Sequence, residues 1–234
     1  MIKITNTDVY GWEAAIRGMR NPMNSWDKSD SHWCNDDCPH VLYDTEPAKE
    51  CDNGVNGFCI GDNDIKLMKN LSKAGTDHSK YLRMINVTCD ITAPLYWYKE
   101  FDTYKVGTVA NSCSTMHKIH EKEFTLDDFS HEHLDGYGES LLKQIIDNLN
   151  WCRTWYIDGV DDNPPKDKKW WWQMIQLLPS SYNQRRTVQL NYQVLKNMYH
   201  ARKNHKLDEW RDFCKWIESL PYAKELIVGD VGGE

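Results

Sequence analysis

The chain has 234 residues, of which 40% are hydrophobic and 27% are charged, and its formal net charge at pH 7 is -7. This composition is typical of a soluble globular protein, and the negative charge excludes a general surface for nucleic-acid polymers or anionic membranes. The length fits one large domain or two small ones, and we predict a single domain over residues 1–234.

Tryptophan and tyrosine are unusually frequent, with 11 Trp and 12 Tyr against only 5 Phe. Both side chains combine a large apolar ring with a polar group, which suits clefts and subunit interfaces. The N-terminus lacks a basic start followed by an apolar core, and no apolar run approaches about 18 residues. We therefore expect no signal peptide, no membrane span and a cytoplasmic location, in which the eight Cys are reduced.

The first third of the chain is predicted to hold a strand, two helices and a long loop. Residues 2–10 alternate loosely as in a strand, and residues 11–18 begin a helix that Asn21-Pro22 ends. Residues 25–63 are rich in Asp, Cys, Asn and Gly, which predicts an irregular loop or insertion. Residues 65–74 are predicted to form an amphipathic helix that Gly75 closes.

The long loop contains side chains that bind zinc in other proteins. They are His32, Cys34, Cys38, His40, Cys51 and Cys59. Thiolate and imidazole ligands close in sequence can build a tetrahedral zinc site. The spacing is irregular and contains no Cys-x-x-Cys pair, so we favour a variable loop with free thiols and predict no metal site.

The remaining two thirds are predicted to be mainly helical. The clearest strand is predicted at residues 81–91, where apolar and polar residues alternate, and Ala93-Pro94 stops it. Further helices are predicted at residues 95–102, 140–156 and 170–178, with a turn-rich loop up to His120 and a proline-containing linker at 161–169. Residues 183–220 are predicted to form one long helix or two in series. The fold class is therefore α+β, rich in helix, with a small antiparallel sheet.

The spacing between Asn191 and Arg202 is informative within that last segment. Eleven residues are close to three helical turns, so the amide and the guanidinium are predicted on one face, roughly 16 Å apart. An amide and a forked cation on one rigid helix can hold two parts of a planar anionic ligand such as a nucleotide. The alternative is a surface helix whose polar residues face water.

A second motif follows the predicted strand directly. Within residues 98–116, Thr-Tyr-Lys at residues 103–105 precedes Asn-x-x-Ser at residues 111–114. Together with Asn-x(3)-Leu-x(6)-Arg at residues 191–202, this pattern resembles the flavin-dependent thymidylate synthase family (ThyX). The order and spacing of the motifs carry the resemblance, because each motif is weak alone.

The resemblance covers roughly residues 1–25 and 65–220 and implies a fold, an activity and ligands. It implies the ThyX fold, assembled as a cytoplasmic homotetramer with ligand sites between subunits. It further implies methylation of dUMP to dTMP, with methylenetetrahydrofolate as donor and with FAD as the source of the hydride. The implied partners are a pyrimidine nucleotide and a folate.

The resemblance also implies roles for individual residues. Ser114 and Arg202 are implied to act as catalytic residues at the nucleotide. The implied FAD contacts are Lys105, Asn111, Asn191 and His205. The implied nucleotide contacts are Ser114 and Arg202, with Arg185 and Arg186 as substitutes for arginines of the family. For Ser114 alone, the alternative is a turn hydroxyl bonded to its own backbone.

Several cations of the family motifs are replaced in this chain. Arg-His-Arg becomes Thr-Tyr-Lys at residues 103–105, and two further arginines appear as Met116 and Ile175. Each lost bidentate contact typically costs ~1.5–3 kcal/mol of ligand binding. We therefore expect either flavin-dependent methylation of a pyrimidine nucleotide or, as the alternative, a non-catalytic protein of the same fold that captures or senses a different nucleotide. A third alternative is an interaction protein that uses its Trp and Tyr surface.

Overall fold

The computed structural model describes residues 1–34 and 54–229, and its elements place the chain in the α+β class, as predicted. The larger sheet has the strand order β1-β5-β7-β6, formed by β1 (Lys3–Tyr10), β5 (Asn86–Pro94), β7 (Asn183–Asn191) and β6 (Val109–Ser112). A smaller antiparallel sheet has the order β2-β4-β3, formed by β2 (His32–Trp33), β4 (Phe58–Cys59) and β3 (Gly54–Val55).

The chain divides into two compact units. Unit 1 comprises residues 1–5, 90–103 and 110–187, and unit 2 comprises residues 6–89, 104–109 and 188–234. The division passes through strands of the larger sheet. A single domain over residues 1–234 stays a prediction, and each unit is described by itself below.

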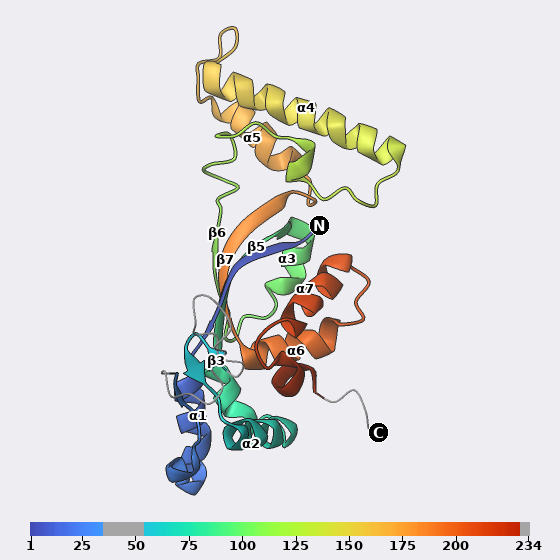
Figure 1. Cartoon of the computed structure of the whole chain (residues 1–234). Helices are drawn as coiled ribbons and strands as arrows, with labels where there is room; N and C mark the ends of the chain where they lie inside the picture. Colours follow the sequence, from blue (N-terminus) through green and yellow to red (C-terminus); the bar gives the residue numbers. More distant parts are fainter. Residues whose placement is uncertain (35–53, 230–234) are drawn as a thin grey trace, which may run out of the picture. The chain divides into compact units, whose positions relative to one another are not determined.

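Unit 1 contains three helices among its described residues, α3 (Leu95–Phe101), α4 (Gly136–Asp158) and α5 (Lys168–Leu177). Figure 1 shows α4 and α5 packed beside each other. Asp135 caps α4 by accepting a hydrogen bond from Gly138 N, and Asp167 caps α5 by accepting one from Lys169 N. The core between these helices consists of Ile119, Phe124, Phe129, Leu142, Ile146, Leu149, Cys152 and Met174.

Unit 2 is built on helices α1 (Trp12–Arg20), α2 (Asp62–Lys73), α6 (Tyr192–Arg202) and α7 (Asp208–Glu218). A 3-10 helix (Ser79–Arg83) and a π-helix (Lys224–Val228) pack against α6. The buried face of α7 consists of Glu209, Trp210, Phe213, Cys214 and Ile217. The second of the two helices predicted in series at residues 183–220 is therefore α7.

Four sequence predictions of secondary structure are wrong in part. The strand predicted at residues 81–91 begins only at Asn86, because Ser79–Arg83 forms a 3-10 helix. Residues 183–191 are the strand β7 rather than the start of a helix. The loops predicted at 103–120 and 25–63 contain the strand β6 and the short strands β2 to β4. Cys38, His40 and Cys51 lie outside the described residues.

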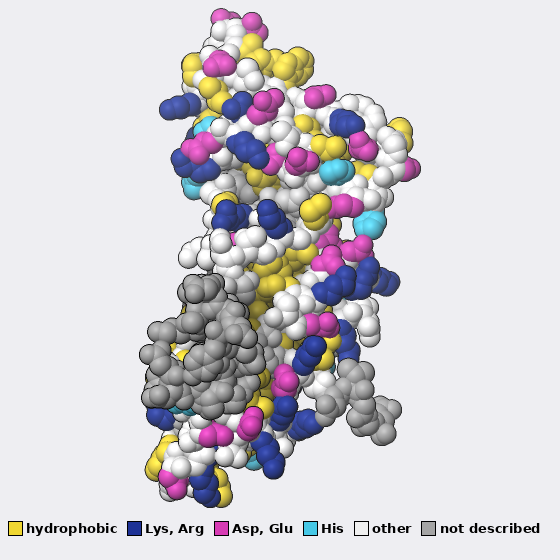
Figure 2. All heavy atoms as spheres, viewed as in Figure 1, with side chains coloured by type: hydrophobic (Ala, Val, Ile, Leu, Met, Phe, Trp, Pro, Cys, Tyr) yellow, Lys and Arg dark blue, Asp and Glu magenta, His cyan; other side chains and the backbone are white. Residues whose placement is uncertain are grey.

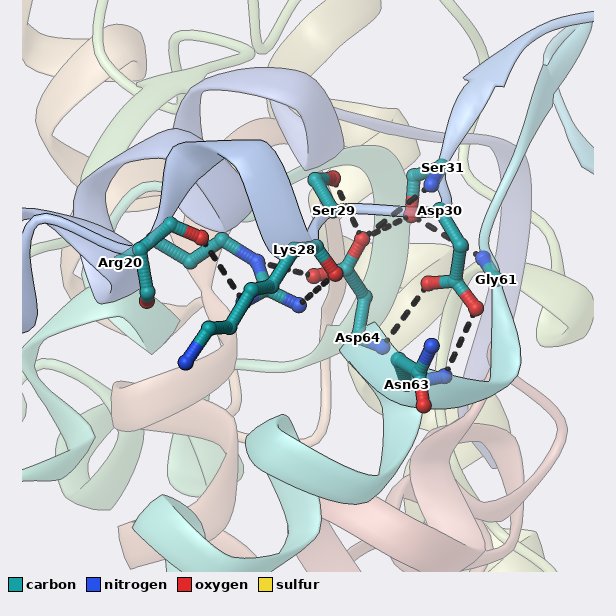
Figure 3. Close-up of polar contacts among 9 residues, drawn as sticks. Arg20, Lys28, Ser29, Asp30, Ser31, Gly61, Asn63 and Asp64 are labelled. Atoms are coloured by element: carbon teal, nitrogen blue, oxygen red, sulfur yellow. Dashed lines mark hydrogen bonds and ion pairs between the residues drawn. The ribbon is translucent and has the colours of Figure 1, made fainter.

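A buried ion pair fixes α1 to α2 within unit 2 (Figure 3). Arg20 Nε donates to Asp64 Oδ1 at 2.7 Å, and both side chains are almost fully buried. Asp64 Oδ2 accepts from the hydroxyls of Ser29 and Ser31, both at 2.6 Å, and from Ser31 N at 3.2 Å. Burial raises the pKa of Asp64, but the hydrogen bonds from Ser29, Ser31 and Arg20 outweigh burial and hold this pKa below its ordinary value.

The segment between these helices also caps α2. The Asp30 carboxylate accepts from the backbone N–H groups of Asn63 at 2.9 Å and Asp64 at 3.2 Å (Figure 3). Gly61 permits this approach, because a Cβ there would lie 2.2 Å from Asp30 Cγ. Residues 28–31, predicted as irregular loop, are therefore held in one conformation by α2.

Candidate functional site

Asn191 and Arg202 mark the two ends of α6. Asn191 closes β7 and caps the helix, since its side-chain oxygen accepts from Val194 N at 3.0 Å. Arg202 is the last residue of the helix. The prediction that both occupy one helical face is thus corrected for Asn191, whose buried side chain serves the helix terminus. Asn191 and Arg202 therefore lie at opposite ends of α6.

Two aromatic side chains hold the guanidinium of Arg202. Its Nε donates to the Tyr104 hydroxyl at 3.0 Å. Its central carbon lies 5.0 Å from the ring centroid of Trp210 and 5.7 Å from that of Tyr104. His205 joins the same cluster, with its ring 6.3 Å from that of Trp210 in an edge-on arrangement. Arg202 is therefore oriented by its surroundings rather than free to rotate.

The segment formed by residues 104–109 follows α6 from one end to the other. Tyr104 contacts Arg202 at the C-terminal end, whereas Gly107 lies against the N-terminal end. A Cβ on Gly107 would lie 2.7 Å from Asn191 Nδ2 and 3.0 Å from Val194 Cγ2. Within unit 2, Tyr104 of the sequence motif is thus brought to the Asn191–Arg202 helix.

Gly107→Ala tests this close approach. Gly107 has φ +81 and no room for a Cβ, so the variant should lose ~1–3 kcal/mol of stability. Gly57→Ala is the matched control, because Gly57 has φ +80 but no atom within 4 Å of the added Cβ. Thermal unfolding followed by circular dichroism should show the larger drop for Gly107→Ala. Equal drops for both variants would contradict the close contact with Asn191.

A cavity of about 430 Å³ lies between α6, the end of α2 and the turn that follows it. Its lining includes Ser72, Thr76, Ser79, Gln193, Lys196, Asn197 and His200. Ser79 Oγ donates to Gln193 Oε1 at 2.9 Å, and Gln193 Nε2 donates to Asn197 Oδ1 at 3.2 Å. Lys196 Nζ donates to Ser72 O at 2.8 Å, and burial lowers the pKa of Lys196.

Sequence reasoning missed this cavity, although the sequence carries a signal for it. Gln193, Lys196, Asn197 and His200 recur at helical spacing and form one polar face of α6. Three of the cavity residues, Ser72, Ser79 and Gln193, are buried polar groups. Buried side chains on the polar face of a helix point to a binding site more strongly than exposed ones do. Their burial can be read only from the structure, so the sequence alone did not reveal the cavity.

Ser114 and Asn111 lie in unit 1. Asn111 is exposed on the strand β6, in a region predicted to be loop. Ser114 follows that strand, and its hydroxyl accepts from Met116 N at 3.2 Å and His117 N at 2.9 Å. This is the turn hydroxyl considered as the alternative for Ser114. These two N–H groups use both lone pairs of the hydroxyl oxygen, so a ligand contact is compatible with this geometry through the hydroxyl proton.

Arg185 and Arg186 are neighbouring residues of β7 in unit 1, and each pairs with an acidic side chain. Arg185 Nη2 donates to Asp90 Oδ2 at 2.5 Å, and this hydrogen bond raises the pKa of Arg185, whose side chain is 57% exposed. Arg186 donates to Asp102 Oδ1 at 2.7 Å, and its guanidinium lies 3.7 Å from the ring centroid of Tyr98. The Arg186 side chain is only 13% exposed. Arg185 is therefore the better placed of the two to meet a ligand.

Within residues 1–34 and 54–229, no group of three or more His, Cys, Asp or Glu side chains is arranged to hold a metal ion. Of the cysteines in the segment at residues 25–63, Cys34 follows β2 and is half-buried, and Cys59 is buried on β4. Across the described residues, no helix is long and apolar enough to cross a membrane.

Solved structures of ThyX share the fold of this chain. One is thymidylate synthase X from Helicobacter pylori with FAD and dUMP, at 16% identity, with 97% of each chain covered and a TM-score of 0.63. A second structure of the enzyme from the same organism, also with FAD and dUMP, has 15% identity, coverage of 95% of this chain and 98% of that chain, and a TM-score of 0.61. The ThyX fold predicted from the motifs is thereby confirmed.

Comparison of the sequence alone gives no match. No protein-family model matches the chain, and no curated protein is significantly similar to it. The chain therefore shares the fold of ThyX, but its sequence identity is too low for function to be inferred from the similarity. The roles of individual residues rest on their geometry.

Proposed function

We propose that this chain binds a flavin and a pyrimidine nucleotide and catalyses flavin-dependent methylation of that nucleotide. The observation that carries the proposal is the contact of residues 104–109 with both ends of α6. This contact places Gly107 against Asn191 and Tyr104 against Arg202, on a fold that binds FAD and dUMP in the Helicobacter pylori structures.

We propose that the cavity on α6 takes the polar portion of a flavin. Its amides, hydroxyls and ammonium can bond the oxygen and nitrogen atoms of a dinucleotide, and about 430 Å³ is within the size range of small-molecule sites. We assign flavin contacts to Gln193, Lys196 and Asn197. The contacts predicted from the sequence, which are Lys105, Asn111, Asn191 and His205, are retained. FAD supplies the hydride when it is bound.

Arg202, Ser114 and Arg185 are proposed to contact the nucleotide, with Arg186 as a further predicted contact. A guanidinium oriented by Tyr104 and Trp210 can make a bidentate contact to a phosphate or a carbonyl at little cost in side-chain entropy. Ser114 can donate its hydroxyl proton while its oxygen still accepts from the backbone. Methylenetetrahydrofolate as methylene donor, a role in dTMP biosynthesis, a homotetramer and a cytoplasmic location belong to the same proposal.

Capture of a nucleotide without catalysis is the second candidate function. It is favoured by the replacement of two family arginines by Met116 and Ile175 and by the pairing of Arg186 with Asp102. Both replacements leave apolar side chains where the family has cations, so a ligand of lower charge, or no catalysis at all, is expected in this case.

The visible absorbance spectrum of the purified protein separates the two functions. After addition of FAD and desalting, we expect a retained flavin band. Asn197→Ala should lower the retained flavin, whereas Asn204→Ala, which removes an exposed amide after α6, should not. A colourless protein that dUMP nevertheless stabilises against heat would contradict the redox function and favour nucleotide capture.

A further inference from the structure

Two adjoining cavities lie beside α1 in unit 2. The first, of about 260 Å³, lies between one face of α1 and the segment at residues 26–33. The second, of about 210 Å³, lies between residues 9–14 and the small sheet. Both are lined by Glu13, Trp33 and Phe58, so these three side chains stand at the junction. The described linings contain no residue assigned above to the flavin or the nucleotide.

Much of the wall opposite α1 belongs to a part of the chain that does not resemble ThyX. Residues 26–33 and 55–58 lie within the stretch at 25–63, which the motif resemblance leaves out. Figure 2 shows hydrophobic side chains next to charged side chains of both signs at the lower end of the view, where Figure 1 draws α1. The two cavities are therefore a feature of this chain rather than of the motifs that it shares with ThyX.

The wall of the first cavity is held in place from behind. Arg20 donates from Nη1 to Ser25 O at 3.1 Å and from Nη2 to Lys28 O at 2.9 Å (Figure 3). The Trp26 indole N–H donates to Asn21 Oδ1 at 2.7 Å. The backbone on both sides of Trp26 is thus fixed to the buried end of α1. A ligand in this cavity would meet a wall that is already ordered.

A carboxylate and a guanidinium stand side by side in the first cavity. Glu13 and Arg17 are both exposed and lie one helical turn apart on α1, with Arg17 Nη1 3.9 Å from Glu13 Oε1. This distance is too long for a hydrogen bond, so each group can still bond a ligand. Arg20, the other guanidinium of the lining, is buried against Asp64. A ligand therefore meets a negative and a positive group that are close together.

The second cavity is mainly apolar. Val9, Val55 and Phe58 are buried residues of its lining, whereas Trp33 is 60% exposed. The ring of Trp33 lies edge-on to that of Phe58, with the two centroids 5.2 Å apart. Among the described residues, this lining contains no Lys, Arg or His, and its one carboxylate is that of Glu13 at the junction. Such a cavity suits the apolar part of a ligand whose charged part lies next door.

We propose that the two cavities together bind a free α-amino acid with a large apolar side chain. The ammonium and the carboxylate of an α-amino acid are bonded to one carbon, so their separation is similarly short to that between Glu13 and Arg17. Glu13 accepts from the ammonium, and Arg17 donates to the carboxylate. The side chain contacts Trp33 and Phe58 in the second cavity. This ligand is neither a flavin nor a nucleotide, so the inference does not depend on the proposed function.

Calorimetric titration of the full chain with L-phenylalanine tests the proposal. We expect saturable binding of this amino acid. Phenethylamine lacks the carboxylate and 3-phenylpropionate lacks the ammonium. Each should bind about tenfold or more weakly than L-phenylalanine, because each loses one charge-assisted contact.

Two variants that remove one charge each should show opposite preferences. Arg17→Gln should weaken L-phenylalanine about tenfold but should not weaken phenethylamine, which has no carboxylate. Glu13→Gln should weaken L-phenylalanine to a similar extent but should not weaken 3-phenylpropionate, which has no ammonium. Arg83→Gln is the matched control, because Arg83 is an exposed guanidinium of unit 2 outside both linings.

Trp33→Leu tests the contact with the side chain of the ligand. It should weaken all three probes about tenfold, since each carries the same phenyl ring. Trp151→Leu is the matched control, because Trp151 is 61% exposed on α4 in unit 1. Equal affinities of these two variants for L-phenylalanine would overturn the proposed placement of the side chain.

The absence of saturable L-phenylalanine binding to the unmodified protein would overturn the proposal, as would equal affinities of Arg17→Gln and Arg83→Gln. Binding of phenethylamine or 3-phenylpropionate as tight as that of L-phenylalanine would also overturn it, because the site would then not require both charges. A protein that retains no flavin but binds L-phenylalanine through Arg17 would contradict the proposed function and support the amino-acid site.

Discussion

Asp64→Asn should lower the stability of this protein by ~3–5 kcal/mol, because it leaves the Arg20 charge buried without its partner. Arg20 is 4% exposed and Asp64 is fully buried. Both carboxylate oxygens accept hydrogen bonds, from Arg20, Ser29 and Ser31 (Figure 3). An amide replaces one acceptor by a donor, which then faces a guanidinium or two hydroxyls.

The expected fall in the melting temperature is about 6–20 °C for a chain of this size. Asp62→Asn is the matched control, since Asp62 is an exposed acid in the first turn of the same helix and its loss should change stability by less than about 0.5 kcal/mol. Thermal unfolding followed by circular dichroism measures both. A melting temperature of Asp64→Asn equal to that of the control would refute the contribution of the buried pair.

The same residue predicts a pH dependence of stability. The pKa of Asp64 in the folded state lies below its ordinary value of 3.8. The ion pair therefore contributes fully above about pH 3.8 and is lost as the pH falls through the lowered pKa. Urea unfolding at a series of acidic pH values should show a steeper loss for the unmodified protein than for Asp64→Asn. Parallel losses would show that another carboxylate controls acid unfolding.

The strand β7 illustrates why part of the fold escaped sequence analysis. Its inward positions are occupied by the polar Gln184 and Arg186 as well as by the apolar Val188 and Leu190. The alternation of apolar and polar residues that is typical of a strand is therefore hidden in the sequence. These polar side chains are stable inside because distant residues pair with them: Gln184 donates to Cys113 O, and Arg186 pairs with Asp102. Such partners are far away in sequence, so no local pattern reveals them.

Elements with a regular apolar pattern were predicted well. The predicted helix at 140–156 lies within α4, and the stripe from Trp210 to Ile217 is the buried face of α7. The strands of two residues in the smaller sheet are shorter than any periodicity can detect. Long periodic elements are therefore predictable here, whereas elements fixed by tertiary hydrogen bonds are not.

In the candidate site, too, the features set by helix geometry were predictable from the sequence, and the features set by tertiary contacts were not. The spacing of Asn191 and Arg202 follows from helix geometry alone, and the structure retains it. The contact of residues 104–109 with α6 depends on one glycine that has φ +81 and on the hydroxyl of Tyr104. A single glycine and a single hydroxyl produce no periodic pattern in the sequence, so this contact could not be predicted from it. The aromatic replacement at Tyr104, which seemed only a departure from the family motif, is the residue that orients Arg202.

Arg202→Ala should weaken dUMP binding by ~1.5–3 kcal/mol, which is about ten- to 150-fold, because it removes the charge-assisted contact that we propose between Arg202 and the nucleotide. Tyr104→Phe should have a smaller effect of ~0.5–1.5 kcal/mol, since it removes the acceptor of Arg202 Nε but keeps the ring that packs beside the guanidinium. The order of the two effects follows from their mechanisms: one variant deletes the binding group, and the other loosens its orientation.

Lys203→Ala is the matched control for charge, because Lys203 is an exposed cation that follows Arg202 directly, with its ammonium near Tyr199. Calorimetric titration with dUMP gives the affinities, and size-exclusion chromatography checks that the oligomeric state is unchanged. Arg202→Ala with the affinity of Lys203→Ala would remove Arg202 from the site. Full affinity of Tyr104→Phe beside a strong loss in Arg202→Ala would keep Arg202 as the ligand contact and reject orientation by the tyrosine hydroxyl.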